Sequence, residues 1–211
     1  VEVKNRSYHP GGAANSVANI LSLGAQATLM GVVGKDADGR RLKTILNESG
    51  IDTENVISAS GRPTTSKIRI VAHGQQVMRA DLEDTGPVGA RITGRMIKGL
   101  RSIIDSIDGI AISDYAKGVV TPAFMSALIT MAREAGKPVA ADIKPPNKDL
   151  FKGVTLITPN RKEASLISGV RITDGDSLKE AGFRIRNDLG LEAVLITLGG
   201  DGMALFQGDG G

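Results

Sequence analysis

The sequence predicts an α/β fold with three layers, in which a mostly parallel, doubly wound sheet carries helices on both faces and a small β-sheet lid interrupts the order. Strand-like and helix-like apolar patterns alternate through most of the 211 residues. Residues 27–33 are an apolar run, typical of a strand buried on both faces. The exception is a pair of alternating runs, 66–72 and 76–81, joined at His73-Gly74-Gln75, which predicts a β-hairpin with one face open to solvent or a partner.

Capping residues mark the helices. The first, 14–23, is followed by Gly24, which suits the left-handed backbone beyond a helix. Asp36 caps the second, and Thr121 with Pro122 supplies a cap and a proline at the first helical position of a later one. The expected helices span residues 14–23, 37–49, 88–107, 122–135, 160–168 and 177–189. The other expected strands span residues 109–113, 139–142, 154–157, 193–197 and 203–206.

We expect two parts, an α/β core of residues 13–57 and 82–211 and a β lid of residues 1–12 and 58–81, whose sheet residues 1–3 could join. Such excursions often close over a ligand. Both ends of the sequence look incomplete, because no element precedes residue 1 and an α/β domain normally continues with a crossover helix after a strand.

Composition excludes several classes of function. The 26 Lys and Arg are nearly balanced by 23 Asp and Glu, no basic tract occurs, Trp is absent and aromatics are 3%, so we expect no nucleic-acid partner. Without cysteine there are no disulfides or thiolate metal sites, which favours the cytoplasm. No apolar run approaches the roughly 18 residues of a membrane span, so we expect no membrane partner.

Five polar segments fall where ligands of parallel sheets bind, beyond the carboxyl ends of strands or at helix starts. They are residues 11–15, 113–118, 142–145, 158–163 and 197–202. In the first, the backbone of Gly11 and Gly12 can approach a ligand closely, and the amide of Asn15 can both donate to and accept from a diol. A turn followed by a helix start explains this segment equally well.

The other segments have two interpretations each. Asp114 and Lys117 are placed for polar ligand contacts or form an ordinary loop ion pair. Lys144 is a candidate phosphate contact or an ordinary residue after a strand. Asn160 and Glu163 could organise a Mg²⁺-bound water, or form a capping box, which the local sequence alone favours.

The last segment, with Thr197, Gly199 and Gly202, could cradle a nucleotide phosphate or be a hairpin turn. It is not a P-loop, because GxxxxGK[ST] is absent from the sequence. No GxGxxG opens the first strand-to-helix turn either, which disfavours a dinucleotide enzyme.

The order of these motifs resembles the ribokinase-like PfkB carbohydrate kinases. The general resemblance rests on Gly11-Gly12-x-x-Asn15, Leu23-Gly24-Ala25, Gly31-x-x-Gly34-x-Asp36-x-x-Gly39, Asn160-x-x-Glu163 and Thr197-x-Gly199-x-x-Gly202. A narrower resemblance is to the D-glycero-β-D-manno-heptose-7-phosphate kinases, which occur alone or fused to a nucleotidyltransferase. It rests on residues 10–15, Pro63-Thr64-Thr65-Ser66-Lys67-x-Arg69, Gln75-Gln76-x-x-Arg79-x-Asp81, residues 113–118 and residues 158–160.

The resemblance implies a ribokinase-like fold and an ATP- and Mg²⁺-dependent phosphorylation of D-glycero-D-manno-heptose 7-phosphate to the 1,7-bisphosphate, for lipopolysaccharide core precursors. Separately, the exposed edge of the lid is a pairing liability, so we expect a homodimer joined through the hairpins. The implied substrate-binding residues are Gly11, Gly12, Asn15, Lys67, Arg69, Arg79, Asp114 and Lys117. The implied nucleotide-binding residues are Lys144, Asn160, Glu163, Thr197, Gly199 and Gly202, with Glu163 holding the metal through water.

Two features of the resembling family are missing. One is an opening strand with a sugar-binding aspartate; the other is an Asp-x-x-Gly-Ala-Gly-Asp segment whose last aspartate deprotonates the acceptor hydroxyl. We therefore expect the catalytic aspartate downstream of Gly211 and little turnover by these 211 residues alone. A PfkB kinase for another sugar or nucleoside, and a non-catalytic sugar-binding fragment, remain alternatives; a dehydrogenase is less favoured.

Overall fold

The computed structural model describes residues 4–208 and divides into two compact units, Val1–Gly86 and Pro87–Gly211. Residues 1–3, which could join the lid sheet, lie outside the described residues. No helix within residues 4–208 is long and apolar enough to cross a membrane.

The first unit contains a short parallel pair of strands with two helices. In chain order these are α1 (Ala13–Ser22), β1 (Gly31–Gly34), α2 (Ala37–Glu48) and β2 (Val56–Ala59). Leu46 and Ile51, at most 1% exposed, lie in an apolar core that also contains Leu29 and Val33. Burial of these side chains stabilises the unit by removing apolar surface from water.

The strand expected over residues 27–33 is wrong for residues 27–30. β1 begins only at Gly31, which pairs with Val56, because β2 has four residues and the ladder extends no further than its partner. Leu29 is nevertheless buried, so its apolar character reflects the core rather than a strand.

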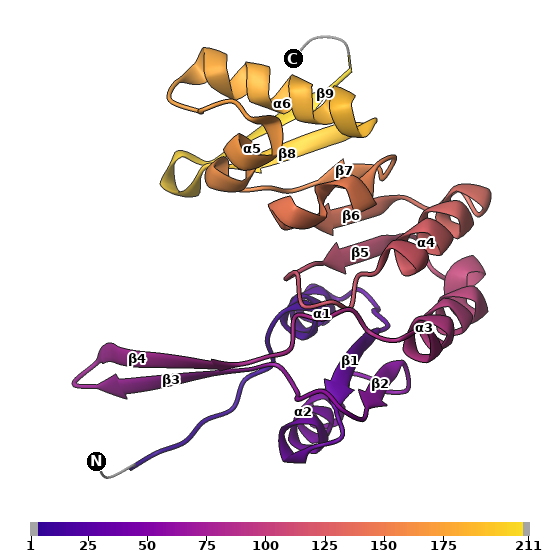
Figure 1. The fold of residues 1–211 in the computed structure, drawn as a ribbon, viewed down its shortest axis with the longest axis vertical. Helices are drawn as coiled ribbons and strands as arrows, with labels where there is room; N and C mark the ends of the chain where they lie inside the picture. The colour runs from indigo at the N-terminus through magenta and orange to yellow at the C-terminus, as the bar shows by residue number, and fades with distance from the viewer. Residues whose placement is uncertain (1–3, 209–211) are drawn as a thin grey trace. The chain divides into compact units, whose positions relative to one another are not determined.

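The expected β-hairpin is confirmed. β3 (Ser66–Ala72) and β4 (Gln75–Leu82) pair antiparallel, and Figure 1 shows them projecting as a ribbon from the rest of the first unit. His73 and Gly74 form the turn, both with positive φ (50° and 75°), as the two-residue turns that suit a right-twisted ribbon require. Apart from half-buried Ser66, every residue of the two strands is exposed.

The second unit is built on a five-stranded sheet with the order β5-β6-β7-β8-β9, which can be followed in Figure 1. The first four strands are parallel and β9 is antiparallel. The strands are β5 (Ile110–Ser113), β6 (Val139–Asp142), β7 (Leu156–Ile157), β8 (Ala193–Thr197) and β9 (Met203–Gln207). This is the mostly parallel α/β sheet that the sequence predicts.

Four α-helices and three short 3₁₀-helices accompany this sheet. They are α3 (Ala90–Ile103), η1 (Ile104–Ser106), α4 (Pro122–Glu134), η2 (Pro145–Phe151), α5 (Arg161–Ser168), α6 (Gly175–Leu189) and η3 (Gly199–Asp201). α3 packs on α4, and α5 packs on α6. Gly182 of α6 lies against the ring of Phe206, where a Cβ atom would clash, so this contact requires glycine.

Two further elements begin two residues later than expected. The strand expected from residue 154 begins at Leu156, because the Val154 N–H closes a turn onto the Phe151 carbonyl. The helix expected from residue 88 begins at Ala90, because Gly89 has an extended backbone (φ −66°, ψ 160°) and forms the N-cap. The 3₁₀-helix η2 was not expected at all.

The topology of the second unit brings polar residues to one edge. Because β5 to β8 run parallel, their carboxyl ends share that edge. Asp114 follows β5, Lys144 follows β6, Asn160 follows β7, and Thr197 ends β8. These are four of the residues singled out from the sequence.

Candidate functional site

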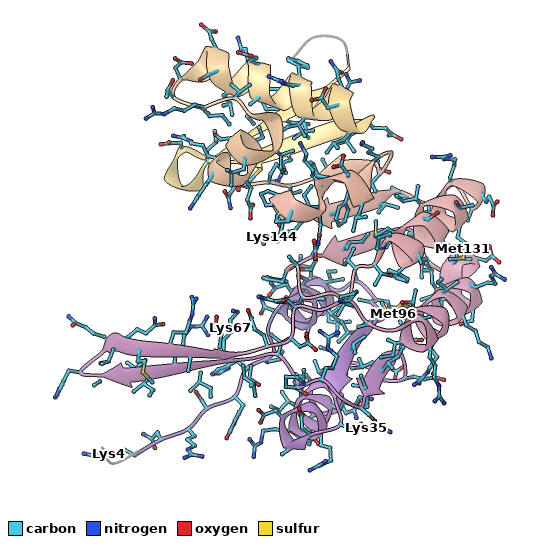
Figure 2. The ribbon with its side chains drawn as sticks, in the orientation of Figure 1. Lys4, Lys35, Lys67, Met96, Met131 and Lys144 are labelled. Atoms are coloured by element: carbon cyan, nitrogen blue, oxygen red, sulfur yellow. The ribbon has the colours of Figure 1, made fainter. Side chains whose placement is uncertain are left out.

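Lys144 lies among acidic groups at the carboxyl edge of the second sheet; Figure 2 labels it. Its Nζ atom is 2.6 Å from Oε1 of Glu163 and 3.8 Å from Oδ1 of Asp142. The same ammonium lies 5.6 Å from the ring centroid of Tyr115, within cation–π range. One cation is therefore shared by groups from the ends of β5 and β6 and from α5.

Glu163 has two structural partners. Its Oε2 accepts from the backbone N–H of Asn160 (3.0 Å), while the Asn160 Oδ1 accepts from the backbone N–H of Glu163 (2.9 Å). This is the capping box that the sequence favoured, and it begins α5. The other carboxylate oxygen accepts from Lys144, so one side chain caps the helix and holds the cation.

Charge and burial set the protonation of this cluster. Burial raises the pKa of Asp142 above its ordinary value; the charge of Lys144 opposes the rise, and the charges of Glu163 and Asp114 add to it. Burial alone lowers the pKa of Lys144, but its hydrogen bond to Glu163 and the charges of Asp142 and Glu163 outweigh that effect, so the net shift is upward. Lys144 therefore remains a cation at neutral pH and can attract an anionic group.

Asp114 is only 2% exposed, and both of its carboxylate oxygens accept hydrogen bonds. Oδ1 accepts from the backbone N–H of Ala116 (2.8 Å), and Oδ2 accepts from Nδ2 of Asn147 (2.7 Å). Ala116 has φ 53°, a left-handed conformation that costs a residue with a side chain about 1–3 kcal/mol. Strain beside a buried, oriented carboxylate is typical of functional sites, and half-buried Lys117 follows in the same loop.

The glycine-rich turn after β8 lies beside the start of α5. The Thr197 N–H donates to the Pro159 carbonyl (2.9 Å), and Arg161 forms an ion pair with Asp201 at 2.9 Å. Gly199 and Gly202 adopt positive φ angles of 67° and 85°. The turn connects the antiparallel strands β8 and β9, so the hairpin interpretation is confirmed.

In the first unit, Gly11, Gly12 and Asn15 lie at the start of α1. Gly12 caps the helix with φ 56°, and its carbonyl accepts from the Asn15 N–H (3.1 Å). The Asn15 side chain is exposed, and a Cβ at Gly11 would meet no atom within 4 Å. The start of this helix is thus open to a ligand.

The three basic residues of the hairpin share one face with Asp81, because alternate residues of a strand point the same way. Lys67 Nζ lies 2.9 Å from Oδ2 of Asp81 and 3.9 Å from Oε2 of Glu83. Arg79 Nε lies 3.1 Å from Oδ1 of Asp81. Arg69 stands directly opposite Arg79 in the ladder, so two guanidinium groups share this face.

The structure therefore forms three groups of predicted residues. Lys144, Asn160, Glu163 and Thr197 lie along one edge of the second sheet; Asp114 lies at that edge with Asn147; and Lys67 and Arg79 meet at Asp81. Asn147 was missed, because an asparagine after two prolines has no sequence feature that separates it from an ordinary loop residue.

Comparison with known proteins shows which family the chain belongs to. The model of the family described as "pfkB family carbohydrate kinase" matches residues 1–211. The chain belongs to that family. The resemblance inferred from the sequence motifs is confirmed at this level.

One curated protein shows this similarity along the whole of the matched chain. The bifunctional protein HldE of Trichlorobacter lovleyi is 38% identical over 210 residues, which cover 100% of this chain and 43% of that protein. The chain thus spans less than half the length of this curated relative.

Solved structures of low sequence identity share the ribokinase-like fold. Arabidopsis thaliana ribokinase, complexed with ribose and ATP, superposes with a TM-score of 0.71 at 20% identity, covering 94% of this chain and 63% of that one. Escherichia coli phosphofructokinase-2, complexed with fructose-6-phosphate, gives 0.69 at 19% identity, covering 94% and 65%. The small β-sheet and mostly parallel core of this chain are consistent with that fold.

Proposed function

We propose that the full-length protein transfers the γ-phosphate of ATP to a hydroxyl of a sugar that already carries a phosphate, with D-glycero-D-manno-heptose 7-phosphate as the substrate and the 1,7-bisphosphate as the product. Family membership supports the phosphotransfer, and the similarity to HldE together with the heptose-kinase motifs supports the sugar. The product would serve lipopolysaccharide core synthesis, and the use of ATP suits a cytoplasmic enzyme.

The observation that carries the phosphosugar proposal is the charged face of the hairpin. Like charges directly opposite each other destabilise an antiparallel pair. Asp81 offsets part of this cost through its ion pair with Arg79, and an anion bound between Arg69 and Arg79 would offset the rest. Guanidinium groups bind phosphate by charge-assisted, often bidentate hydrogen bonds. Lys67 already has Asp81 and Glu83 within 4 Å, so we assign it a smaller share of phosphate binding.

The remaining substrate roles follow the motifs. The backbone of Gly11 and Gly12, the Asn15 amide and the Asp114 carboxylate would orient the sugar, with Lys117 as a further anion contact. None of these residues is assigned as the base that deprotonates the acceptor hydroxyl.

We assign the nucleotide to the edge formed by Lys144, Asn160, Glu163 and the turn of Thr197, Gly199 and Gly202. Mg²⁺ keeps several of its waters when protein-bound, so one carboxylate reaching it through water suffices. Glu163 lies at this edge with one oxygen on Lys144 and the other on the Asn160 N–H, and its carboxylate has further acceptor positions for a metal-bound water. The metal would neutralise phosphate charge, and Lys144, which Glu163 and Asp142 already share, would add a smaller attraction for the phosphates.

The proposal predicts how the hairpin arginines affect kinetics. Arg69→Ala combined with Arg79→Ala should raise KM for the phosphosugar by at least about 10²-fold, since each lost charged hydrogen bond costs about 1.5–3 kcal/mol and two are lost. KM for ATP should stay unchanged, and Lys67→Ala should have the smaller effect. Steady-state kinetics with heptose 7-phosphate, other phosphosugars and their unphosphorylated counterparts measures the KM for the sugar and the KM for ATP.

The matched control is Arg91→Ala with Arg95→Ala, two exposed arginines of α3 that remove the same charge elsewhere. An unchanged phosphosugar KM in the hairpin variant would contradict the phosphate assignment. Turnover of unphosphorylated sugars or nucleosides in preference to phosphosugars would favour the alternative, another pfkB kinase. Binding without turnover in the full-length protein would favour a non-catalytic sugar-binding role.

The opposite face of the hairpin supports a homodimer. It carries Ile68, Ile70, Met78 and Leu82, which are 55%, 41%, 51% and 51% exposed. An exposed apolar ribbon is a pairing liability that a second copy of the chain would cover. Ile68→Asp should convert a dimer to a monomer in light scattering at micromolar concentration, whereas Ile68→Val should not; a dimeric Ile68→Asp protein would contradict this interface.

A further inference from the structure

Asn147 makes one side-chain hydrogen bond among the residues that the structure describes, and it goes to Asp114. The donor Nδ2 lies 2.7 Å from the Oδ2 atom of a carboxylate that is 33 residues away in the sequence. A neutral donor to a buried carboxylate forms a charge-assisted bond, which is shorter and stronger than a bond between neutral groups.

Hydrogen bonds and burial hold the backbone of η2 in place around Asn147. The Asn147 N–H donates to the Lys144 carbonyl (2.9 Å) at the start of η2. The next residue, Lys148, donates from Nζ to the Ile167 carbonyl (3.1 Å), and Phe151 at the end of η2 is 0% exposed. η2 is therefore held to α5 at its middle and to the core at its end.

The second oxygen of Asp114 is fixed from the other side. Oδ1 accepts from the Ala116 N–H within the strained loop of residues 114–118, so the two oxygens are held by different segments. A carboxylate offers about four acceptor positions, and these two bonds leave others for the hydroxyls of a ligand. Removing the amide would free the carboxylate to rotate, and it would leave a buried charge with one donor fewer.

We infer that Asn147 is a positioning residue, which holds Asp114 in the orientation that accepts hydrogen bonds from the sugar. The inference rests on the proposed function, because it takes Asp114 as a sugar contact. Its chemistry is preorganisation: a group that is already oriented loses less freedom when the substrate binds. Asn147 itself would not touch the substrate.

A double-mutant cycle in the full-length protein tests this. Isothermal titration with heptose 7-phosphate would measure Kd for the wild type, Asn147→Ala, Asp114→Ala and the double variant. We expect Asn147→Ala to weaken phosphosugar binding about 10-fold, in line with a lost hydrogen bond to a charged group. In the Asp114→Ala background, the same substitution should change Kd less than twofold, because its effect passes through Asp114. The Kd for ATP should be the same in all four proteins.

The control is Asp149→Ala, on the same short helix, where Asp149 is exposed and pairs only with Lys152 in the described structure; its phosphosugar Kd should match the wild type. Additive losses from Asn147→Ala and Asp114→Ala, or an equal loss of ATP affinity, would mean that Asn147 merely supports η2 and would overturn the inference. Loss of binding in Asp114→Ala with none in Asn147→Ala would overturn the inference alone. No phosphosugar binding by the wild type would overturn the proposed function with it.

Discussion

Replacing Asp36 with alanine should lower the free energy of unfolding of the first unit by about 3 kcal/mol, since three hydrogen bonds to one carboxylate are lost together. Oδ1 accepts from the Gly39 N–H (2.7 Å), which caps α2, and from the Thr64 hydroxyl (2.6 Å). Oδ2 accepts from the Thr64 N–H (2.7 Å), and the Thr64 hydroxyl in turn accepts from the Gly34 N–H (2.9 Å). One side chain thus joins the end of β1, the start of α2 and the segment that enters the hairpin.

Close packing around this carboxylate adds to the cost. A Cβ atom at Gly34 would clash with the Asp36 carboxylate and the Thr64 backbone, and one at Gly39 would clash with the Gly34 carbonyl. Alanine would leave the N–H groups of Gly39 and Thr64 without this partner and would remove tight contacts around it. Thr64→Val removes only the hydroxyl and should cost less than Asp36→Ala.

Urea unfolding followed by circular dichroism measures the change. Asp52→Ala is the matched control, because exposed Asp52 accepts one local hydrogen bond, from the Glu54 N–H. Equal unfolding midpoints for the Asp36 and Asp52 variants would contradict the central role of Asp36.

The pH dependence provides a second readout. The Thr64 hydroxyl bond, with the N–H groups of Thr64 and Gly39, holds the pKa of Asp36 below its ordinary value of 3.8, against the opposing effect of burial. The unfolded state therefore binds the proton more readily than the native state. The stability contributed by Asp36 is present above the unfolded pKa and is lost as pH falls through the folded pKa. The gap between wild type and Asp36→Ala should shrink on acidification.

Local chemistry explains which parts of the fold could be predicted. Asp36, Thr121 and Asn160 cap helices through hydrogen bonds to residues three positions on, so their effect is visible in a short window of sequence. β2 escaped prediction because four residues, Val56–Ala59, become a strand only by pairing with β1. Residues 27–30 resemble a strand but have no partner, which is equally non-local.

The candidate site shows the same difference between local features, which could be predicted, and non-local contacts, which could not. The parallel order of β5 to β8 let the sequence place Asp114, Lys144 and Asn160 at one edge. It could not show that Glu163 serves Asn160 and Lys144 at once, because the second contact spans 19 residues. Nor could it show that Asp81 forms ion pairs with both Lys67 and Arg79. These pairs change how much phosphate binding is assigned to each basic residue of the hairpin.

Glu163→Gln should lower kcat of the full-length protein about 10²- to 10³-fold, the range seen when one preorganised electrostatic group is removed from an active site. Glutamine keeps an oxygen that can accept from the Asn160 N–H, so the capping box and α5 should survive. It loses the negative charge that holds Lys144, whose ammonium would then keep Asp142, at 3.8 Å, as its one carboxylate neighbour among residues 4–208. Both the proposed metal-water contact and the position of the phosphate-attracting cation change together.

A second capping box in the chain provides a control that separates a loss of catalytic rate from a loss of stability. α6 begins with an analogous capping box of Asp174 and Ser177, far along the chain from any residue assigned to the nucleotide. Ser177→Ala should cost about 1 kcal/mol of unfolding free energy and leave kcat unchanged, whereas Glu163→Gln should show the reverse pattern. Glu163→Ala should show both losses, because it removes the cap and the charge. Wild-type kcat in Glu163→Gln would show that catalysis does not need the charge of Glu163, because glutamine keeps the helix cap and loses that charge.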